Sequence, residues 1–309
     1  MRILIINNLF SGRHDGAIFT FIRHFSQAGD EVVLRNLEVD TPVAELLGDA
    51  KEFELVVAAG GDGTISAVCY ALRYSGIPVL AFPAGTGNLL ATNLDLPDEP
   101  VALAALAHRS LALDFDMGEV SFLVDGSLHT HGFAVAAGAG FDAEIMKASD
   151  SLKQPFGFGA YILAALSRPN PTYSQFTLEL DDGSVESEGI AVFILNFAKI
   201  APGLSLVHTN DARDGLLEVA VLKPHNAVEL LPALFTLFLD RDGGFPGRAD
   251  ALEIHLSSSV RISADPPLMT QYDGETPDAL TPMEARSLPA STRLVVTEPM
   301  YQRLTAGEG

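Results

Sequence analysis

The sequence contains very little cysteine and few basic residues, and these absences exclude several classes of protein. Cys69 is the only cysteine among 309 residues, so no disulfide can form within the chain and no cysteine cluster can bind a metal. This usage fits a reducing, cytoplasmic environment. The 19 lysines and arginines stand against 40 aspartates and glutamates, which gives a formal net charge of −21 that repels nucleic acid and anionic surfaces. Nucleic acid is therefore not expected as a partner.

Long apolar runs are also missing. The N-terminal "MRILIINN" holds a short apolar stretch before Asn7, which is too short for the apolar core of a signal peptide. No segment reaches the roughly 18 consecutive apolar residues that a membrane-spanning helix needs. We expect a cytoplasmic protein that contacts a membrane only transiently and at its periphery.

The pattern of apolar residues changes near residue 117. Before that point, short apolar runs such as "RILII" and "FELVVAA" alternate with segments of helical periodicity, which predicts a mostly parallel sheet with right-handed crossovers. After it, strand-like runs with turn signals such as Asp182-Gly183 predict mainly antiparallel structure, interrupted by helix-like segments at 157–167 and 226–239. We therefore expect an α/β domain over 1–117 and a second domain over 118–289. The segment from about 290 to 309 is a candidate to return to the first domain.

A glycine-rich turn follows one of the expected strands. "GGDGT", Gly60 to Thr64, precedes a helix-like stripe, and such a turn lets backbone amides approach a ligand while the helix adds its positive end. The lysine and spacing of a Walker loop are missing, as is the G-x-G-x-x-G pattern. An aspartate in an anion-binding turn suits a cation such as Mg²⁺ between it and the phosphates. The alternative is an ordinary strand-to-helix turn.

A second turn of the same kind favours the phosphate interpretation. "PAGTGN", Pro83 to Asn88, again follows a strand and adds Thr86 and Asn88 as small hydrogen-bonding side chains. Turns at the ends of successive parallel strands meet in one crevice, where α/β folds bind ligands.

At this point the sequence resembles the diacylglycerol kinase catalytic-domain superfamily, which includes bacterial lipid kinases and sphingosine kinases. GGDGT alone also occurs in NAD kinases and phosphofructokinases, so the order and spacing of all the motifs carry the resemblance. The motifs run almost from end to end of the chain: Gly60–Thr64, Pro83–Asn88, "GFDAEI" at 140–145, "DARDGLLEV" at 211–219 and "DGE" at 273–275.

The resemblance implies an α/β nucleotide-binding domain and an antiparallel β-sandwich, with the active site in the cleft between them. It implies transfer of a phosphate from ATP to a lipid hydroxyl, with Glu275 as the general base and Asp62 as the alternative base. The residues that it assigns to ATP are Gly60, Gly61, Asp62, Gly63, Thr64, Ile65, Ser66, Thr86 and Asn88.

Further assignments follow from the same resemblance. In bacterial members a segment matching "DARDGL" holds a structural Mg²⁺, which places Asp211, Asp214 and the Leu216 carbonyl as metal ligands. Arg13 either reaches the ATP phosphates or is an exposed loop arginine. Asp142 either contacts a lipid head group or is a turn aspartate. A homodimer is a candidate assembly.

Two departures from the family pattern concern function. Leu9 replaces the proline of the N-P-x-S-G signature, and Leu89 stands where many bacterial diacylglycerol kinases carry a catalytic aspartate. Three hypotheses therefore stay open: a lipid kinase acting on diacylglycerol, a sphingoid base or a related lipid; an NAD kinase or other non-lipid kinase; and a non-catalytic binding protein. The apolar stretch at 230–239 is either a lipid-binding element or a helix packed on the sandwich.

Overall fold

The computed structural model of the protein describes residues 1–11, 16–27, 29–39, 41–140, 171–201, 204–205, 211–224 and 252–306. The chain divides into two compact units, and each is considered by itself. Unit 1 comprises Met1–Met117 and Pro289–Gly309, and unit 2 comprises Gly118–Leu288. The long strands β5 (Ala112–Val124) and β17 (Met283–Val295) each contribute residues to both units.

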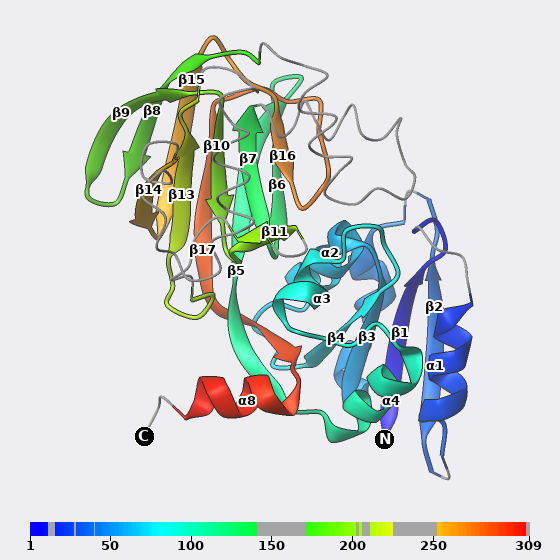
Figure 1. Cartoon of the computed structure of the whole chain (residues 1–309). Helices are drawn as coiled ribbons and strands as arrows, with labels where there is room; N and C mark the ends of the chain where they lie inside the picture. The colour runs from blue at the N-terminus through cyan, green and yellow to red at the C-terminus, as the bar shows by residue number, and fades with distance from the viewer. Residues whose placement is uncertain are drawn as a thin grey trace. The chain divides into compact units, whose positions relative to one another are not determined.

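Unit 1 is an α/β unit whose parallel sheet has the order β2-β1-β3-β4, with the end of β17 beside β4 (Figure 1). Its other elements are β1 (Arg2–Asn8), α1 (Ala17–Phe25), β2 (Glu31–Leu37), the 3-10 turns η1 (Val43–Leu47) and η2 (Ala50–Glu52), β3 (Leu55–Gly60), α2 (Asp62–Ala71), β4 (Pro78–Pro83), α3 (Leu89–Asn93), α4 (Pro100–Arg109) and α8 (Glu298–Thr305).

The sheet of unit 1 forms because its strands are apolar throughout. β3 is buried along its whole length and so are the central five residues of β1, as expected for parallel strands covered on both faces. Helices α1 and α4 pack side by side, where the rings of Phe25 and His108 stack at 4.3 Å. The segment "VAELL" forms the short 3-10 helix η1. The parallel α/β prediction is confirmed.

Unit 2 is built from two antiparallel layers. One has the order β14-β13-β10-β7-β16; the other joins β17, β15, β8 and β9, and β5 pairs with β6. The bounds are β6 (Ser127–Phe133), β7 (Ala136–Gly140), β8 (Ser174–Leu180), β9 (Gly183–Gly189), β10 (Ala191–Leu195), β13 (Leu217–Leu222), β14 (Leu252–Ser257), β15 (Ser259–Asp265) and β16 (Thr270–Tyr272), beside a small ribbon of β11 (Lys199–Ala201) and β12 (Leu204–Ser205).

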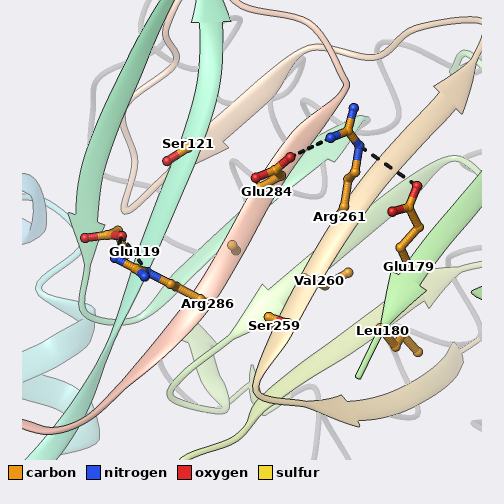
Figure 2. A pocket seen from close by; sticks show the side chains of 10 residues that line it. Glu119, Ser121, Glu179, Leu180, Ser259, Val260, Arg261, Glu284 and Arg286 are labelled. Carbon is orange, nitrogen blue, oxygen red and sulfur yellow. Dashed lines mark hydrogen bonds and ion pairs between the residues drawn. The ribbon is translucent and has the colours of Figure 1, made fainter. Parts of the chain in front are cut away.

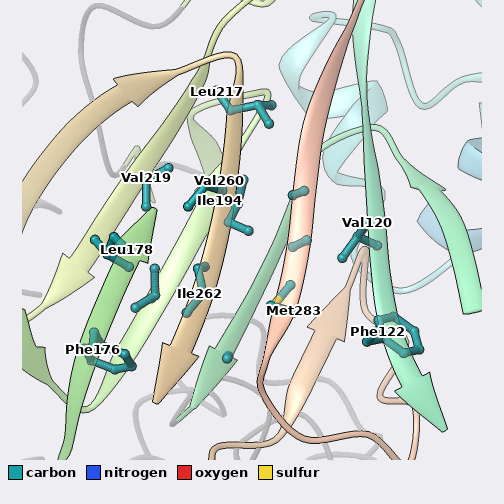
Figure 3. Packing of buried hydrophobic residues seen from close by; sticks show 14 of the residues in the cluster. Val120, Phe122, Phe176, Leu178, Ile194, Leu217, Val219, Val260, Ile262 and Met283 are labelled. Carbon is teal, nitrogen blue, oxygen red and sulfur yellow. The ribbon is translucent and has the colours of Figure 1, made fainter. Parts of the chain in front are cut away.

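The core of unit 2 lies between these layers (Figure 3). Phe176 and Ile262 come from one layer and Ile194 and Val219 from the other, and all four are fully buried. In β8 and β15, buried residues alternate with exposed ones, so one face of their layer meets solvent. The prediction of an antiparallel sandwich is confirmed.

Some expectations fall outside the described residues. The helix-like segments at 157–167 and 226–239 are among these. Within the described ranges, no helix combines the length and apolar character that crossing a bilayer requires.

Candidate functional site

In unit 1, three neighbouring parallel strands end at one edge of the sheet. β1 ends at Asn8, β3 at Gly60 and β4 at Pro83. The chain leaves β1 toward β2 and leaves β3 toward β4, so the strand order reverses between β1 and β3. Such a switch point at the carboxyl ends of strands is where α/β sheets bind ligands.

Helix α2 begins directly at the first glycine turn. Its N-cap is Gly61, in an extended conformation and without a side-chain capping bond. The first amides of a helix have no acceptor inside it, and the helix dipole adds positive charge there. The turn therefore presents backbone donors, which suits a phosphate or another anion.

The two glycine turns touch through their backbones. A Cβ atom on Gly85 would lie 2.5 Å from the Cα of Gly61, so only glycine fits there. The amide of Ala84 also donates to the carbonyl of Gly60 at 3.1 Å. The structure thus brings together the two segments that the sequence singled out.

The side chain of Asp62 joins these two turns. Its Oδ1 accepts the amide of Leu90 at 3.0 Å, and the amides of Leu89 and Asn88 also donate to the carboxylate. A Cβ atom on Gly87 would lie 3.0 Å from Oδ2. Burial of the carboxyl group raises the pKa of Asp62, although the amides oppose this shift. Asp62 therefore binds the start of α3.

Two asparagines complete the arrangement. Asn88 adopts φ = 51° and its side chain bonds Gly85 in both directions: the amide of Gly85 donates to Oδ1 at 2.9 Å, and Nδ2 donates to the carbonyl at 3.0 Å. Asn8, at the end of β1, donates through Nδ2 to Oγ1 of Thr64 at 2.8 Å. Hydrogen bonds thus tie β1 to the first turn and close the second.

The remaining predicted residues of unit 1 differ in exposure. Thr86 is exposed at the second turn, where its hydroxyl can meet a ligand. The side chains of Ile65 and Ser66 are buried, and the amide of Ile65 donates to the carbonyl of Gly61 at 3.1 Å, so these two residues support the first turn from inside α2. Arg13 lies outside the described residues.

In unit 2, the predicted base sits at the end of a tight turn. Glu275 donates its amide to the carbonyl of Tyr272 at 2.8 Å, and the amide of Tyr272 donates back at 3.0 Å. Asp273 and Gly274, between them, have φ of 39° and 91°, the positive values of a type I′ hairpin turn. The side chain of Glu275 is exposed, so it can accept a proton from a bound molecule.

Asp273 is buried beneath this turn. Its carboxylate accepts the amide of Ala134 at 2.5 Å and the amides of Val135 and Ala136 at 2.9 Å each. The pKa of the neighbouring Tyr272 phenol is raised to about 12. Burial is the main cause, and the negative charges of Glu275 and Asp273 add to it.

The predicted metal ligands lie in one short turn of unit 2. Asp211 and Asp214 are exposed, and the amide of Asp214 donates to the carbonyl of Asp211 at 3.3 Å. Oδ1 of Asp214 accepts the amide of Leu216 at 2.9 Å. Two accessible carboxylates and a carbonyl are hard oxygen donors, which fit Mg²⁺. The described residues contain no group of three or more His, Cys, Asp and Glu arranged to hold a metal.

A pocket of about 600 Å³ lies on the solvent side of β17, β15 and β8 (Figure 2). Its charged side chains pair with one another: Arg286 lies 2.6 Å from Glu119, and Arg261 lies 2.6 Å from Glu284. None of the predicted site residues lines this pocket. Its paired charges form a solvated ionic network, so it is not a candidate active site.

Sequence reasoning missed two residues that shape the site. Asn8 received no predicted role, and Asp273 was noted only as part of the DGE motif. The Asp-Gly pair at 273–274 is a known hairpin signal and could have revealed the turn. Asp142 lies outside the described residues.

Two family models match the chain. The model of the diacylglycerol kinase catalytic domain matches residues 2–120, and the model of the YegS C-terminal NAD kinase beta sandwich-like domain matches residues 134–296.

Individual relatives agree with this. A probable lipid kinase, YegS-like, of Xanthomonas campestris pv. campestris is 30% identical over 78% of this chain and 81% of its own length. An uncharacterised protein of Synechocystis sp. is 28% identical over 80% of this chain, but the match spans only 55% of that relative. A crystal structure of a diacylglycerol kinase from Bacillus anthracis shares the fold, with a TM-score of 0.74 at 17% identity, covering 97% of this chain and 98% of that one.

Proposed function

The chain belongs to the diacylglycerol kinase family of lipid kinases, and on this premise we propose that it transfers the γ-phosphate of ATP to a hydroxyl of a lipid acceptor. The observation that carries the proposal is the contact between the two glycine turns at the switch point of unit 1. This contact aligns backbone donors from both turns at one edge of the sheet.

In this proposal the phosphates of ATP bind at the two turns. The amides at the start of α2, from Gly61 to Thr64, bind the phosphate oxygens, with Arg13 as a further contact. The hydroxyl of Thr86 acts from the second turn, and Asn88 shapes that turn through its bonds to Gly85. Backbone donors held in place before binding stabilise the charge of a phosphoryl group without reorganising during the reaction. This suits a transfer that depends on positioning and charge stabilisation.

Magnesium has two proposed places. ATP carries its own Mg²⁺, which neutralises part of the phosphate charge when bound. A second ion would be held by Asp211, Asp214 and the carbonyl of Leu216. Because the Asp62 carboxylate accepts backbone amides, its local geometry supports a positioning role more than proton transfer.

Glu275 is the proposed general base. As the acceptor hydroxyl attacks the γ-phosphorus, its proton moves to the Glu275 carboxylate, a new P–O bond forms, and the bond to the departing ADP breaks. An exposed carboxylate on a rigid turn supports this role.

The proposed acceptor is diacylglycerol, a sphingoid base or a related lipid alcohol. Support comes from the names of the relatives, which are lipid kinases and diacylglycerol kinases. A lipid substrate requires at least transient contact with a membrane. Asp142 remains a proposed contact for the lipid head group.

The test is a labelled-ATP assay over a panel of diacylglycerol, sphingosine and other lipid alcohols in mixed micelles, with NAD as an additional acceptor. We expect Mg²⁺-dependent labelling of at least one lipid. We expect E275Q to lower kcat by about 10²- to 10⁴-fold while the KM for ATP changes little.

A matched control is D278N, which changes an exposed carboxylate in the segment that follows the turn. It should leave kcat unchanged. Labelling of NAD alone would replace the lipid kinase with an NAD kinase. ATP binding by calorimetry without transfer to any acceptor would indicate a binding protein.

A further inference from the structure

We propose that Asp273 is a positioning residue that fixes the placement of Glu275, an inference that rests on the proposed function. Glu275 has an exposed side chain, so the position of its carboxylate depends on the backbone of the turn that carries it. That backbone is the two-residue turn of Asp273 and Gly274, which closes on Tyr272 through two hydrogen bonds.

The carboxylate of Asp273 anchors this turn to the segment between β6 and β7. Three consecutive amides, those of Ala134, Val135 and Ala136, donate to it, and the amide of Asp273 donates back to the carbonyl of Ala136 at 2.8 Å. The turn is thus held by side-chain and backbone bonds to the same three residues.

The anchoring segment is itself fixed from its other side by Asn196. Nδ2 of Asn196 donates to the carbonyl of Ala134 at 2.8 Å, and the backbone amides of Asn196 and Phe197 donate to the carbonyl of Val135. Every backbone amide and carbonyl of residues 134–136 named here therefore has a partner, and all three residues are buried. Buried hydrogen bonds of this number restrain the backbone of residues 134–136.

Aromatic side chains support the same turn. The ring of Tyr272 stacks on His131 of β6 at 4.8 Å and lies 6.0 Å from the ring of Phe122 of β5. The residue that precedes the turn is therefore packed in place, while Glu275 on the other side of the turn remains exposed.

Burial separates the role of Asp273 from that of a catalytic group. Asp273 is 8% exposed and its oxygens accept three amides, so it is not available to exchange a proton with a substrate. We infer that Asp273 acts through Glu275.

A double-mutant cycle tests this role in the full-length protein, with labelled ATP and the acceptor found in the lipid panel. An asparagine at 273 would place an NH₂ group, which cannot accept hydrogen bonds, against the backbone amide donors, so the turn that carries Glu275 should loosen. We therefore expect D273N to lower kcat by about ten- to a hundredfold with little change in the KM for ATP. Because Asp273 acts through Glu275, adding D273N to E275Q should not lower kcat any further. The double variant should match E275Q alone.

Hydrogen exchange gives a readout that does not depend on turnover. In wild type the amides of residues 134–136 should be protected, and D273N should speed their exchange while leaving β10 and β13 unchanged. If D273N does not fold, G274A provides the second variant, because a side chain at φ = 91° strains the turn without removing the carboxylate. G274A should reproduce the loss of kcat, and D278N should not.

The failures of the two proposals can be told apart. If E275Q lowers kcat as expected but the cycle is additive, or if exchange at 134–136 is unchanged in D273N, the positioning role is wrong and the general base stands. If E275Q keeps full activity, Glu275 is not the base and the role of Asp273 falls with it.

Discussion

Asp62 in unit 1 and Asp273 in unit 2 both bind backbone amides through their carboxylates, but the groups around them differ. Each carboxylate accepts three consecutive backbone amides, from residues 88–90 and 134–136 respectively. Around Asp62 lie glycine turns and the start of a helix, which present hydrogen-bond donors. Beyond Asp273 lies Glu275, an exposed acceptor. In the proposed reaction, donors are needed for the phosphate charge and an acceptor is needed for the hydroxyl proton, and the same kind of anchored carboxylate lies next to each candidate group.

The two regions also differ in how tightly the backbone is packed. The turns around Asp62 touch through glycine Cα atoms, whereas the turn of Asp273 is fixed by hydrogen bonds and by the stacked ring of Tyr272. The turns around Asp62 should therefore be sensitive to added side-chain atoms, and the turn of Asp273 should be sensitive to the loss of a hydrogen-bonding group.

Among the changes that probe this contrast, the largest effect is expected from G85A. The new Cβ would meet Gly61 at 2.5 Å, and neither backbone can move without separating the two turns. If about 1–3 kcal/mol of strain is carried into the transition state, kcat/KM for ATP should fall by about five- to 150-fold. The control is G48A, where φ is −58° and the nearest atom to a new Cβ is 4.0 Å away. Steady-state kinetics of both variants measure the difference, and equal activity would contradict the close contact.

A smaller effect is expected from D62N, and it should differ in kind from that of D273N. An asparagine cannot accept all three amides of residues 88–90, so the second turn should loosen and the KM for ATP should rise about tenfold. Its kcat should change less than its KM. D98N, an exposed carboxylate of the same unit, serves as the control. If D62N and D273N gave the same kinetic profile, the contrast between donor side and acceptor side would be wrong.

The smallest effect concerns a carboxylate of unit 2 that is paired by side chains instead of amides. Burial would raise the pKa of Glu253, but bonds from Lys223, His255 and Ser187 outweigh it and lower the pKa to about 2. A lowered pKa stabilises the folded state above the unfolded value of 4.5, and this stabilisation is lost as the pH falls from 4.5 toward 2.

The measurement is urea unfolding of wild type and E253Q between pH 2 and 7. Wild type should be more stable by about 1–2 kcal/mol near pH 6, and the difference should shrink as the pH falls below 4.5. Activity at neutral pH should be unchanged, since Glu253 has no place in the proposed reaction. A difference in stability that is independent of pH would contradict the ion-pair origin.

Much of the fold could be predicted from local sequence. The continuous apolar runs "FELVVAA" and "RILII" predict strands that are buried on both faces, as in a parallel sheet. The alternation of apolar and polar residues in "SQFTLEL" predicts a strand with one face toward solvent, because successive side chains of a strand point to opposite faces. The segment at 43–47 shows the limit of this reasoning, since a short periodic stretch formed a 3-10 turn. For the site, glycine spacing located both turns but could not give the partners of their side chains.

The sequence by itself determined where the chain turns: glycines at 60, 61 and 85 mark the turns after β3 and β4, and the Asp-Gly pair at 273–274 adopts the positive φ angles that local sterics allow it. Only the tertiary structure decided what the two aspartates do. Asp62 meets Leu90 across 28 residues, and Asp273 meets Ala134 across 139. Such partners are set by how the strands and turns pack, because a carboxylate binds whichever amides the fold brings within about 3 Å of it.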